Sequence, residues 1–176
     1  MSEKIAQELI IREVELPDIQ KIAQINVNVW KSAYKGIIPV SYLDSINYHD
    51  NFQAWKHIFN NQGNDELFLV AELKSEVIGF VWAGPEREKG KQNQSELYAI
   101  YIKEIHQRKG VGKKLFTIIF DEFKERRYQT LILWTLKENP YRFFYESLGG
   151  ELKSTKKEDF KGTKLRLSEY HWNLKP

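Results

Sequence analysis

A predicted strand and a predicted helix meet at one stretch of this chain, His106-Gln-Arg-Lys-Gly-Val-Gly-Lys-Lys-Leu115. Directly before it, residues 96–102 are apolar, aromatic and β-branched, as in a buried strand. Directly after it, residues 115–123 place apolar side chains at helical spacing. Two glycines therefore lie where a strand turns into a helix, with basic residues on both sides of them.

This junction suits the binding of an anion. The first N–H groups of a helix have no partner within the helix, and the helix dipole adds partial positive charge there. Glycine lets the backbone approach a ligand closely, so we expect a phosphate or pyrophosphate. A Walker loop is excluded because it needs glycine at Gln107, and a dinucleotide fingerprint is excluded because it needs Gly or Ala at Leu115. A glycine-rich turn with a solvated basic face is the structural alternative.

Length and composition predict one folded domain over residues 1–176, with residues 1–8 flexible. Apolar residues make up 41% of the chain, and the 27 basic and 24 acidic residues are mixed along it, so no nucleic-acid partner is required. The absence of cysteine excludes disulfides, cysteine-ligated metals and a thiol nucleophile. No stretch has the length of a membrane span or the pattern of a signal peptide, so we expect a cytoplasmic protein without a membrane partner.

Hydrophobic periodicity predicts the element order β-α-α-β-β-β-α-β-α-β-β. The predicted strands cover residues 9–14, 67–72, 77–83, 96–102, 130–136, 151–155 and 163–172. The four predicted helices are one that begins at residue 17, one that carries Phe52, Trp55 and Phe59 on one face, one after the glycine loop, and one from 140 to 148. A short helical piece is also expected around 41–43. Between them we expect a turn-rich link from Trp30 to Pro39 and a polar loop from Gly84 to Gln94.

Two segments resemble motifs of the GCN5-related N-acetyltransferases, the GNAT family. Gln107-Arg-Lys-Gly-Val-Gly112 resembles the family's (Q/R)-x-x-G-x-(G/A) loop, and Asn139-Pro-Tyr-Arg-Phe-Phe-Tyr-Glu-Ser-Leu-Gly-Gly150 resembles its N-P-x-R-x-F-Y-E-x-L-G-G segment, with Tyr141 where Ala is common. The element order also matches. The resemblance implies an α/β (α+β) acyl-CoA acyltransferase fold, with a mixed central sheet of about six to seven strands flanked by about four helices.

The resemblance also implies acetyl-CoA as acetyl donor, with no metal. In the family, amides of the glycine loop hold the pyrophosphate, and the strand before it offers backbone groups to the pantetheine. The residues expected to bind the cofactor are Ile100, Tyr101, Ile102, Gln107, Arg108, Lys109, Gly110, Val111, Gly112, Lys113, Asn139 and Phe144.

By the same resemblance, Tyr145 is the general acid beside the thioester sulfur. A thiol has a pKa near ~8.5 and tyrosine near ~10, so at neutral pH a phenol can protonate the departing thiolate. Deprotonating an amine of pKa ~10.4 at pH 7 costs on the order of 4–5 kcal/mol. Glu96, acting through water, is the candidate base. The structural alternatives are an aromatic core patch for Tyr145 and an exposed strand end for Glu96.

The acceptor is expected between the first two helices, where Trp30, Tyr34 and Tyr42 would suit a cationic amine. We expect a primary amine of a small molecule or peptide, acetylated by direct transfer in a ternary complex. The sequence does not determine the oligomeric state; a homodimer in which the tail strand packs its Tyr170 and Trp172 against a partner is one arrangement that it allows. The alternative from another class is a catalytically silent acyl-CoA binding or sensing protein. Nucleic-acid binding through the Lys/Arg clusters is the least favoured alternative.

Overall fold

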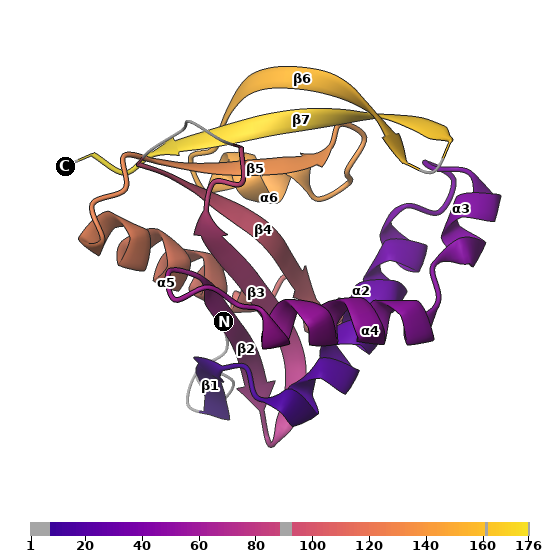
Figure 1. Cartoon of the computed structure of the whole chain (residues 1–176), viewed down its shortest axis with the longest axis horizontal. Helices are drawn as coiled ribbons and strands as arrows, with labels where there is room; N and C mark the ends of the chain where they lie inside the picture. Colours follow the sequence, from indigo (N-terminus) through magenta and orange to yellow (C-terminus); the bar gives the residue numbers. More distant parts are fainter. Residues whose placement is uncertain (1–7, 89–92, 161, 176) are drawn as a thin grey trace.

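The computed structural model describes residues 8–88, 93–160 and 162–175. One seven-stranded sheet with the strand order β1-β2-β3-β4-β5-β7-β6 organises them (Figure 1). The strands are β1 (Leu9–Glu13), β2 (Leu67–Leu73), β3 (Glu76–Pro85), β4 (Gln94–Ile102), β5 (Thr130–Leu136), β6 (Glu151–Phe160) and β7 (Thr163–Asn173). The helices are α2 (Ile19–Ala33), α3 (Val40–Ser45), α4 (Tyr48–Asn60), α5 (Val111–Glu125) and α6 (Arg142–Ser147), with 3₁₀ turns η1 (Leu16–Asp18) and η2 (Glu104–His106).

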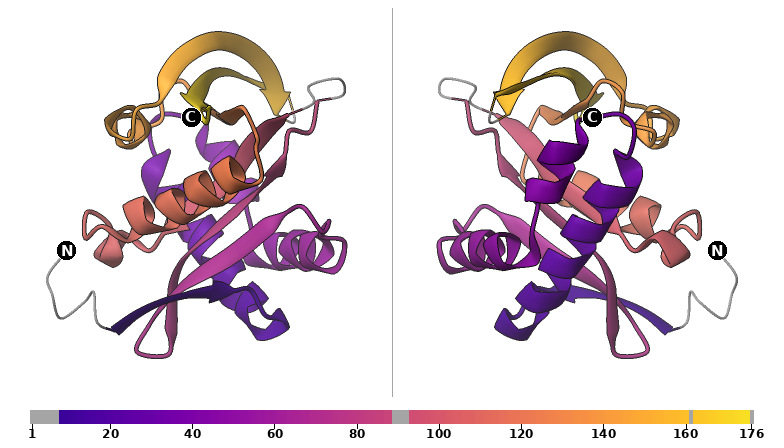
Figure 2. Two further views of the ribbon diagram at one scale, coloured as in Figure 1. Left: turned by 90° about the vertical axis from the view of Figure 1, so that its left-hand side faces the viewer. Right: turned by 90° about the vertical axis from the view of Figure 1, so that its right-hand side faces the viewer.

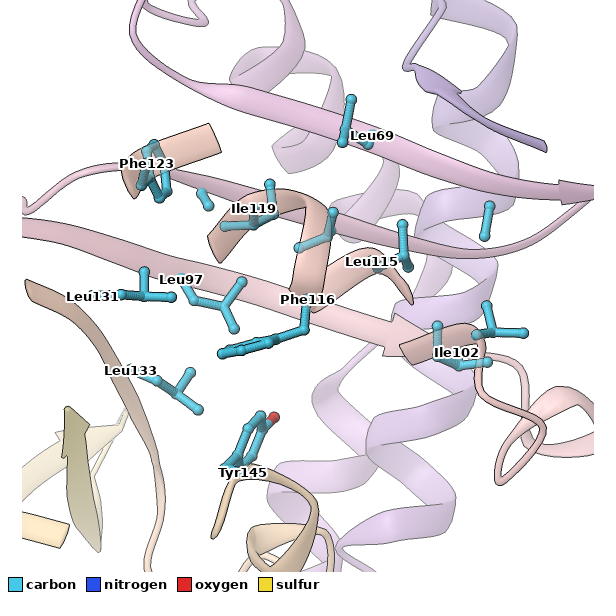
Figure 3. Packing of buried hydrophobic residues seen from close by; sticks show 14 of the residues in the cluster. Leu69, Leu97, Ile102, Leu115, Phe116, Ile119, Phe123, Leu131, Leu133 and Tyr145 are labelled. Atoms are coloured by element: carbon cyan, nitrogen blue, oxygen red, sulfur yellow. The ribbon is translucent and has the colours of Figure 1, made fainter. Parts of the chain in front are cut away.

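Helices cover the two faces of the sheet unequally. Helix α5 packs on one side, and α2, α3 and α4 lie on the other (Figures 1 and 2). The α5 side is the larger core, because Leu115, Phe116, Ile119 and Phe123 all point from the helix onto the strands (Figure 3). These are members of the apolar stripe that the sequence predicts. On the other side α2 and α4 close a second core around Trp55.

The sheet opens between its two central strands. Strands β4 and β5 are parallel and pair only from Gln94 to Glu96 of β4, whereas all other neighbours are antiparallel. The pairing of β3 with β4 also shifts, because Trp82 opposes Ala99 while Ala83 opposes Leu97, which leaves Tyr98 in a bulge. Among the residues that the structure describes, no strand pairs with the β5-facing edge of β4 beyond Glu96.

The predicted fold class is confirmed, but the ends of some elements differ from the prediction. Helix α2 continues to Ala33, so the turn-rich link expected from Trp30 is shorter. Strand β3 extends to Pro85, beyond the expected loop start at Gly84, because a proline at the end of a strand costs no ladder hydrogen bond. The expected flexibility of residues 1–8 falls almost wholly on residues 1–7, which lie outside the described residues. Within the described ranges, no helix combines the length and apolarity needed to cross a membrane.

The partner role expected for the tail strand is wrong. Tyr170 and Trp172 are both only 3% exposed, because β7 lies between β5 and β6 and turns these rings into the α5-side core. Trp172 Nε1 donates to the Leu148 carbonyl at 3.0 Å, which ties the strand to the end of α6. These aromatic residues stabilise the monomer and are not available to a second copy.

Candidate active site

A cavity of about 510 Å³ occupies the opening between β4 and β5. Its lining comes from the carboxyl half of β4, the facing part of β5, the end of α2, the glycine loop and α6. The residues that the two strands contribute to the lining are mostly apolar or aromatic, and polar groups are few. A concave, mostly apolar site with few polar groups is typical of a small-molecule or cofactor site.

The glycine loop forms one end of this cavity. Arg108 and Gly110 have φ angles of 57° and 83°, so the chain turns sharply before α5 begins. The first hydrogen bond of the helix runs from Lys114 N–H to the Gly110 carbonyl at 3.0 Å. The N–H groups of the three residues between them therefore have no carbonyl one turn earlier to bind. Together with the helix dipole, they form an anion-binding surface.

Two further contacts shape this loop. Gln107 Nε2 donates to the Ile102 carbonyl at 3.0 Å, which fixes the loop against the end of β4. A Cβ on Gly112 would lie 3.2 Å from Phe144 Cζ, so a side chain there would fill the space between loop and α6. Gly112 thus leaves the backbone N–H groups of the first helical turn accessible. These N–H groups at the start of α5 fit a pyrophosphate.

Asn139 holds the turn that leads into α6. Its side chain is 4% exposed, donates from Nδ2 to Thr135 Oγ1 at 2.6 Å and accepts from Tyr141 N–H at 2.8 Å. Asn139 also lines the cavity. These bonds attach α6 to β5, so Asn139 fixes where the residues of α6 stand.

Tyr145 stands on α6 at the border between the core and the cavity. Its ring is 7% exposed and packs with Trp172 and Tyr170, while the hydroxyl points into the space between Leu133 and Ile102 (Figure 3). Burial, and then the neighbouring Tyr101, raise the pKa of the Tyr145 phenol well above its ordinary value. Among the described residues we find no hydrogen-bond partner for its hydroxyl, so the group is neutral and available to a ligand.

Of the three residues expected to bind the acceptor, only one lines the cavity. Tyr34, at the end of α2, lines the cavity, while Trp30 packs behind it with ring centroids 4.9 Å apart. Trp30 Nε1 donates to Tyr101 Oη at 2.9 Å, and Tyr42 lies further out, 6.5 Å from Trp30. Of the three, only Tyr34 reaches the cavity, and Trp30 acts on it through Tyr101.

Glu96 does not reach the cavity. Glu96 as a whole residue is 3% exposed, so the alternative of an exposed strand end is wrong. Arg87 binds both of its oxygens, with Nε 3.0 Å from Oε2 and Nη2 close to Oε1. The guanidinium also stacks on the ring of Tyr98, 4.5 Å from its centroid. Glu96 is thus the buried half of an ion pair that anchors the loop after β3.

Most of the residues expected at the site do line the cavity. They are Ile100, Tyr101, Ile102, Gln107, Arg108, Gly110, Gly112, Lys113, Asn139, Phe144, Tyr145 and Tyr34. Five others do not: besides Glu96, Lys109 is exposed, Val111 is a core residue, and Trp30 and Tyr42 lie behind Tyr34. The lining residues that the sequence did not single out for the site include Tyr98, Leu133, Trp134, Thr135 and Phe143. Leu133, Trp134 and Thr135 belong to β5, whose apolar sequence indicates only a buried strand.

Metal ligands do not gather in the described parts of the chain, where no group of three His, Cys, Asp or Glu residues is placed to hold an ion.

Comparison with known proteins shows the family to which this chain belongs. The model of the acetyltransferase (GNAT) family matches residues 29–149, and the chain therefore belongs to this family. It is 30% identical over 162 residues to the uncharacterized N-acetyltransferase YuaI of Bacillus subtilis, covering 92% of this chain and 91% of that protein.

Two further comparisons extend over most of the chain. A spermidine N(1)-acetyltransferase of Thermoplasma acidophilum is 27% identical over 154 residues, or 85% of this chain and 92% of that protein. The solved structure of YncA from Salmonella typhimurium with its cofactor acetyl-CoA has the same fold, with a TM-score of 0.71, 18% identity and coverage of 96% and 95% of the two chains.

Proposed function

We propose that this protein transfers the acetyl group of acetyl-CoA to a primary amine, by direct transfer in a ternary complex. One observation carries the proposal: an anion-binding helix start and a buried, neutral phenol open into the same cavity between two separated strands. The first suits a pyrophosphate and the second suits a leaving thiolate. Neither group is needed for a sheet and helix to pack together.

The cofactor is proposed to lie along β4. The pyrophosphate would bind the amides at the start of α5, with the charges of Arg108 and Lys113 beside it. The pantetheine would then take the place of a strand, because backbone groups from Ile100 to Ile102 face the opening where β5 no longer pairs. YncA was solved with acetyl-CoA, which supports the same cofactor here.

Tyr145 is proposed as the general acid. Attack of the amine on the thioester expels a thiolate, and a buried phenol with a raised pKa keeps its proton until the sulfur takes it. The hydroxyl points into the cavity from a ring fixed by core packing, so little reorganisation is needed. Glu96, in contrast, is bound to Arg87 and lies outside the cavity lining, and we do not assign it the role of base.

The acceptor is proposed to enter from the α2 and α3 side, where Tyr34 faces the cavity. The acceptor that fits an N-acetyltransferase is a primary amine of a small molecule or a peptide. The spermidine N(1)-acetyltransferase among the relatives acts, by its name, on a small polyamine, which makes polyamines the first acceptors to test. We also retain a homodimer as a proposal, to be tested by sedimentation equilibrium, without assigning it a surface.

The test of this function is release of free thiol from acetyl-CoA in the presence of polyamines, amino acids, aminoglycosides and short peptides. We expect turnover with at least one acceptor and binding of CoA measurable by calorimetry. Binding of CoA without turnover by any amine would favour a silent acyl-CoA sensor. Absence of CoA binding would refute the assignment of the cavity.

A further inference from the structure

A tryptophan ring in the cavity lining already holds an ammonium group. Trp134, on β5, lines the cavity, and Nζ of Lys156, on β6, lies 4.2 Å from the centroid of its ring. The negative face of an aromatic ring attracts a cation, and tryptophan does so most strongly among the aromatic side chains. Lys156 is not part of the lining, but its position marks the ring of Trp134 as a cation-binding surface.

Trp134 lies on the side of the sheet that we propose for the acceptor. Successive residues of a strand point to opposite faces, and the preceding residue, Leu133, belongs to the α5-side core. Trp134 packs instead against the apolar cluster that contains Tyr34 and Leu136. The ring is thus held by apolar packing, and it lines the same cavity as Tyr145, the proposed general acid.

The charges beside this ring favour a further cation. Glu158 Oε2 lies 3.6 Å from Lys156 Nζ, and Glu88 Oε1 lies 4.0 Å from it. Glu158 belongs to the same strand as Lys156, whereas Glu88 comes from the segment after β3. Two carboxylates therefore face one ammonium, so these three side chains together carry an excess of negative charge. An incoming ammonium would be attracted both by the ring and by this excess.

The lysine on the ring can be exchanged for another cation. Its side chain is 42% exposed, and β6 is an edge strand of the sheet (Figure 1). Exposed ion pairs contribute little to stability, and a lysine side chain regains rotamer freedom when it is released to water. The ring of Trp134 is fixed by packing, so it stays in place when the ammonium of Lys156 leaves.

We propose that Trp134, Glu88 and Glu158 bind a second cationic group of the acceptor, which takes the place of the Lys156 ammonium. The acceptor is then a diamine or polyamine, with one amine at the thioester and another, as ammonium, on the ring of Trp134. Lys156 acts as an internal competitor that covers the ring until such an acceptor enters. This inference names the substrate class of the proposed acetyltransferase and rests on that proposed function.

A second ammonium on the acceptor should lower its KM. The probes are putrescine, cadaverine and longer α,ω-diaminoalkanes, each compared with the monoaminoalkane of the same chain length. We expect the best diamine to have a KM about tenfold below that of its matched monoamine. The diamine series should show one preferred chain length, because the ring of Trp134 and the hydroxyl of Tyr145 are fixed within one cavity.

Trp134→Leu and Lys156→Gln test the site from both directions, with Lys153→Gln as the matched control. Trp134→Leu removes the ring face, so we expect the KM to rise about tenfold more for the best diamine than for its matched monoamine. Lys156→Gln removes the competitor, so we expect the KM of the diamine to fall about threefold. Lys153 lies on the same strand but pairs with Glu151, outside the cavity lining, so its replacement should change neither KM.

Two results would overturn this inference and leave the proposed function in place. One is equal KM values of the wild type for diamines and monoamines of the same length. The other is a Trp134→Leu variant that loses affinity equally for both kinds of acceptor. If Trp134→Leu does not fold, Lys156→Gln decides, and an unchanged KM for the diamine would then overturn the inference. A wild type that binds CoA but releases no thiol with any amine would refute the proposed function, and this inference with it.

Discussion

The two ends of the cavity are built in different ways. The end proposed for the donor, called the donor end below, consists of main-chain groups from one continuous stretch, residues 100–113, with two glycines keeping the backbone accessible. The end proposed for the acceptor, called the acceptor end below, consists of side chains brought together from α2, β4, β5 and α6. A binding site made of backbone depends on where strands and helices begin, whereas a site made of side chains depends on how distant elements pack. The donor end is therefore the part that a short motif can specify.

Tyr145 is the residue at which the two ends meet, so its substitution should have the largest effect. Tyr145→Phe keeps the ring packing with Trp172 and removes only the hydroxyl. We expect kcat to fall by ~100-fold or more, because the departing thiolate loses its acid, while CoA binding by calorimetry stays unchanged. A variant with full turnover at every pH would remove Tyr145 from the chemistry. It would leave Tyr145 as a member of the aromatic core patch.

Gly112 tests the donor end alone. Because a Cβ there already approaches Phe144 to 3.2 Å, Gly112→Val would push α6 and the loop apart and cover the free amides. We expect the KM and Kd for acetyl-CoA to rise about tenfold or more, as for the loss of a hydrogen bond to a charged group, with kcat at saturation little changed. Thr117→Val, on the same helix but outside the lining, is the matched control. An unchanged Kd for Gly112→Val would argue against the pyrophosphate site.

The sequence predicted the donor end well because each of its features is local. The apolar strand, the glycine pair and the helical stripe from Leu115 to Phe123 all lie within one continuous segment, and the structure places them as expected. Likewise, the glycines after Leu148 end α6, with Gly149 at φ 84°. In these places the residue type restricts the backbone directly, so the pattern determines the structure without knowledge of the tertiary fold.

The acceptor end was predicted less well because its residues depend on packing between distant elements. Trp134 and Thr135 belong to a strand that reads as uniformly buried, and only the opening of β4 from β5 turns them into cavity lining. Tyr98 faces the cavity from a bulge whose position depends on the pairing of β3 with β4. Glu96 was expected near the reacting amine because of its place in the sequence. Its pairing with Arg87 follows from the path of the loop after β3.

The smallest kinetic effect is expected at Glu96. Its measurement distinguishes a residue that takes part in the reaction from one that only supports the structure. If Glu96 only anchors the loop, Glu96→Gln should change kcat less than threefold, far below the losses of ~100-fold that follow removal of a general base. The amide oxygen can still accept from Arg87, and the Arg87 side chain, which is 59% exposed, can turn to water. A loss of ~100-fold in kcat for Glu96→Gln, together with a flattened pH profile, would instead restore Glu96 as the base.

Arg87→Met provides the matching stability measurement, because the two partners of this pair are buried to different extents. Removing Arg87 leaves a carboxylate of 4% side-chain exposure without its counter-charge, and such losses cost about 3–5 kcal/mol of unfolding free energy. Removing the charge of Glu96 leaves only a partly exposed guanidinium. We therefore expect urea denaturation to show a greater loss of stability for Arg87→Met than for Glu96→Gln. Equal losses of unfolding free energy in the two variants would mean that the carboxylate reaches solvent. Water could then connect Glu96 to the acceptor end of the cavity.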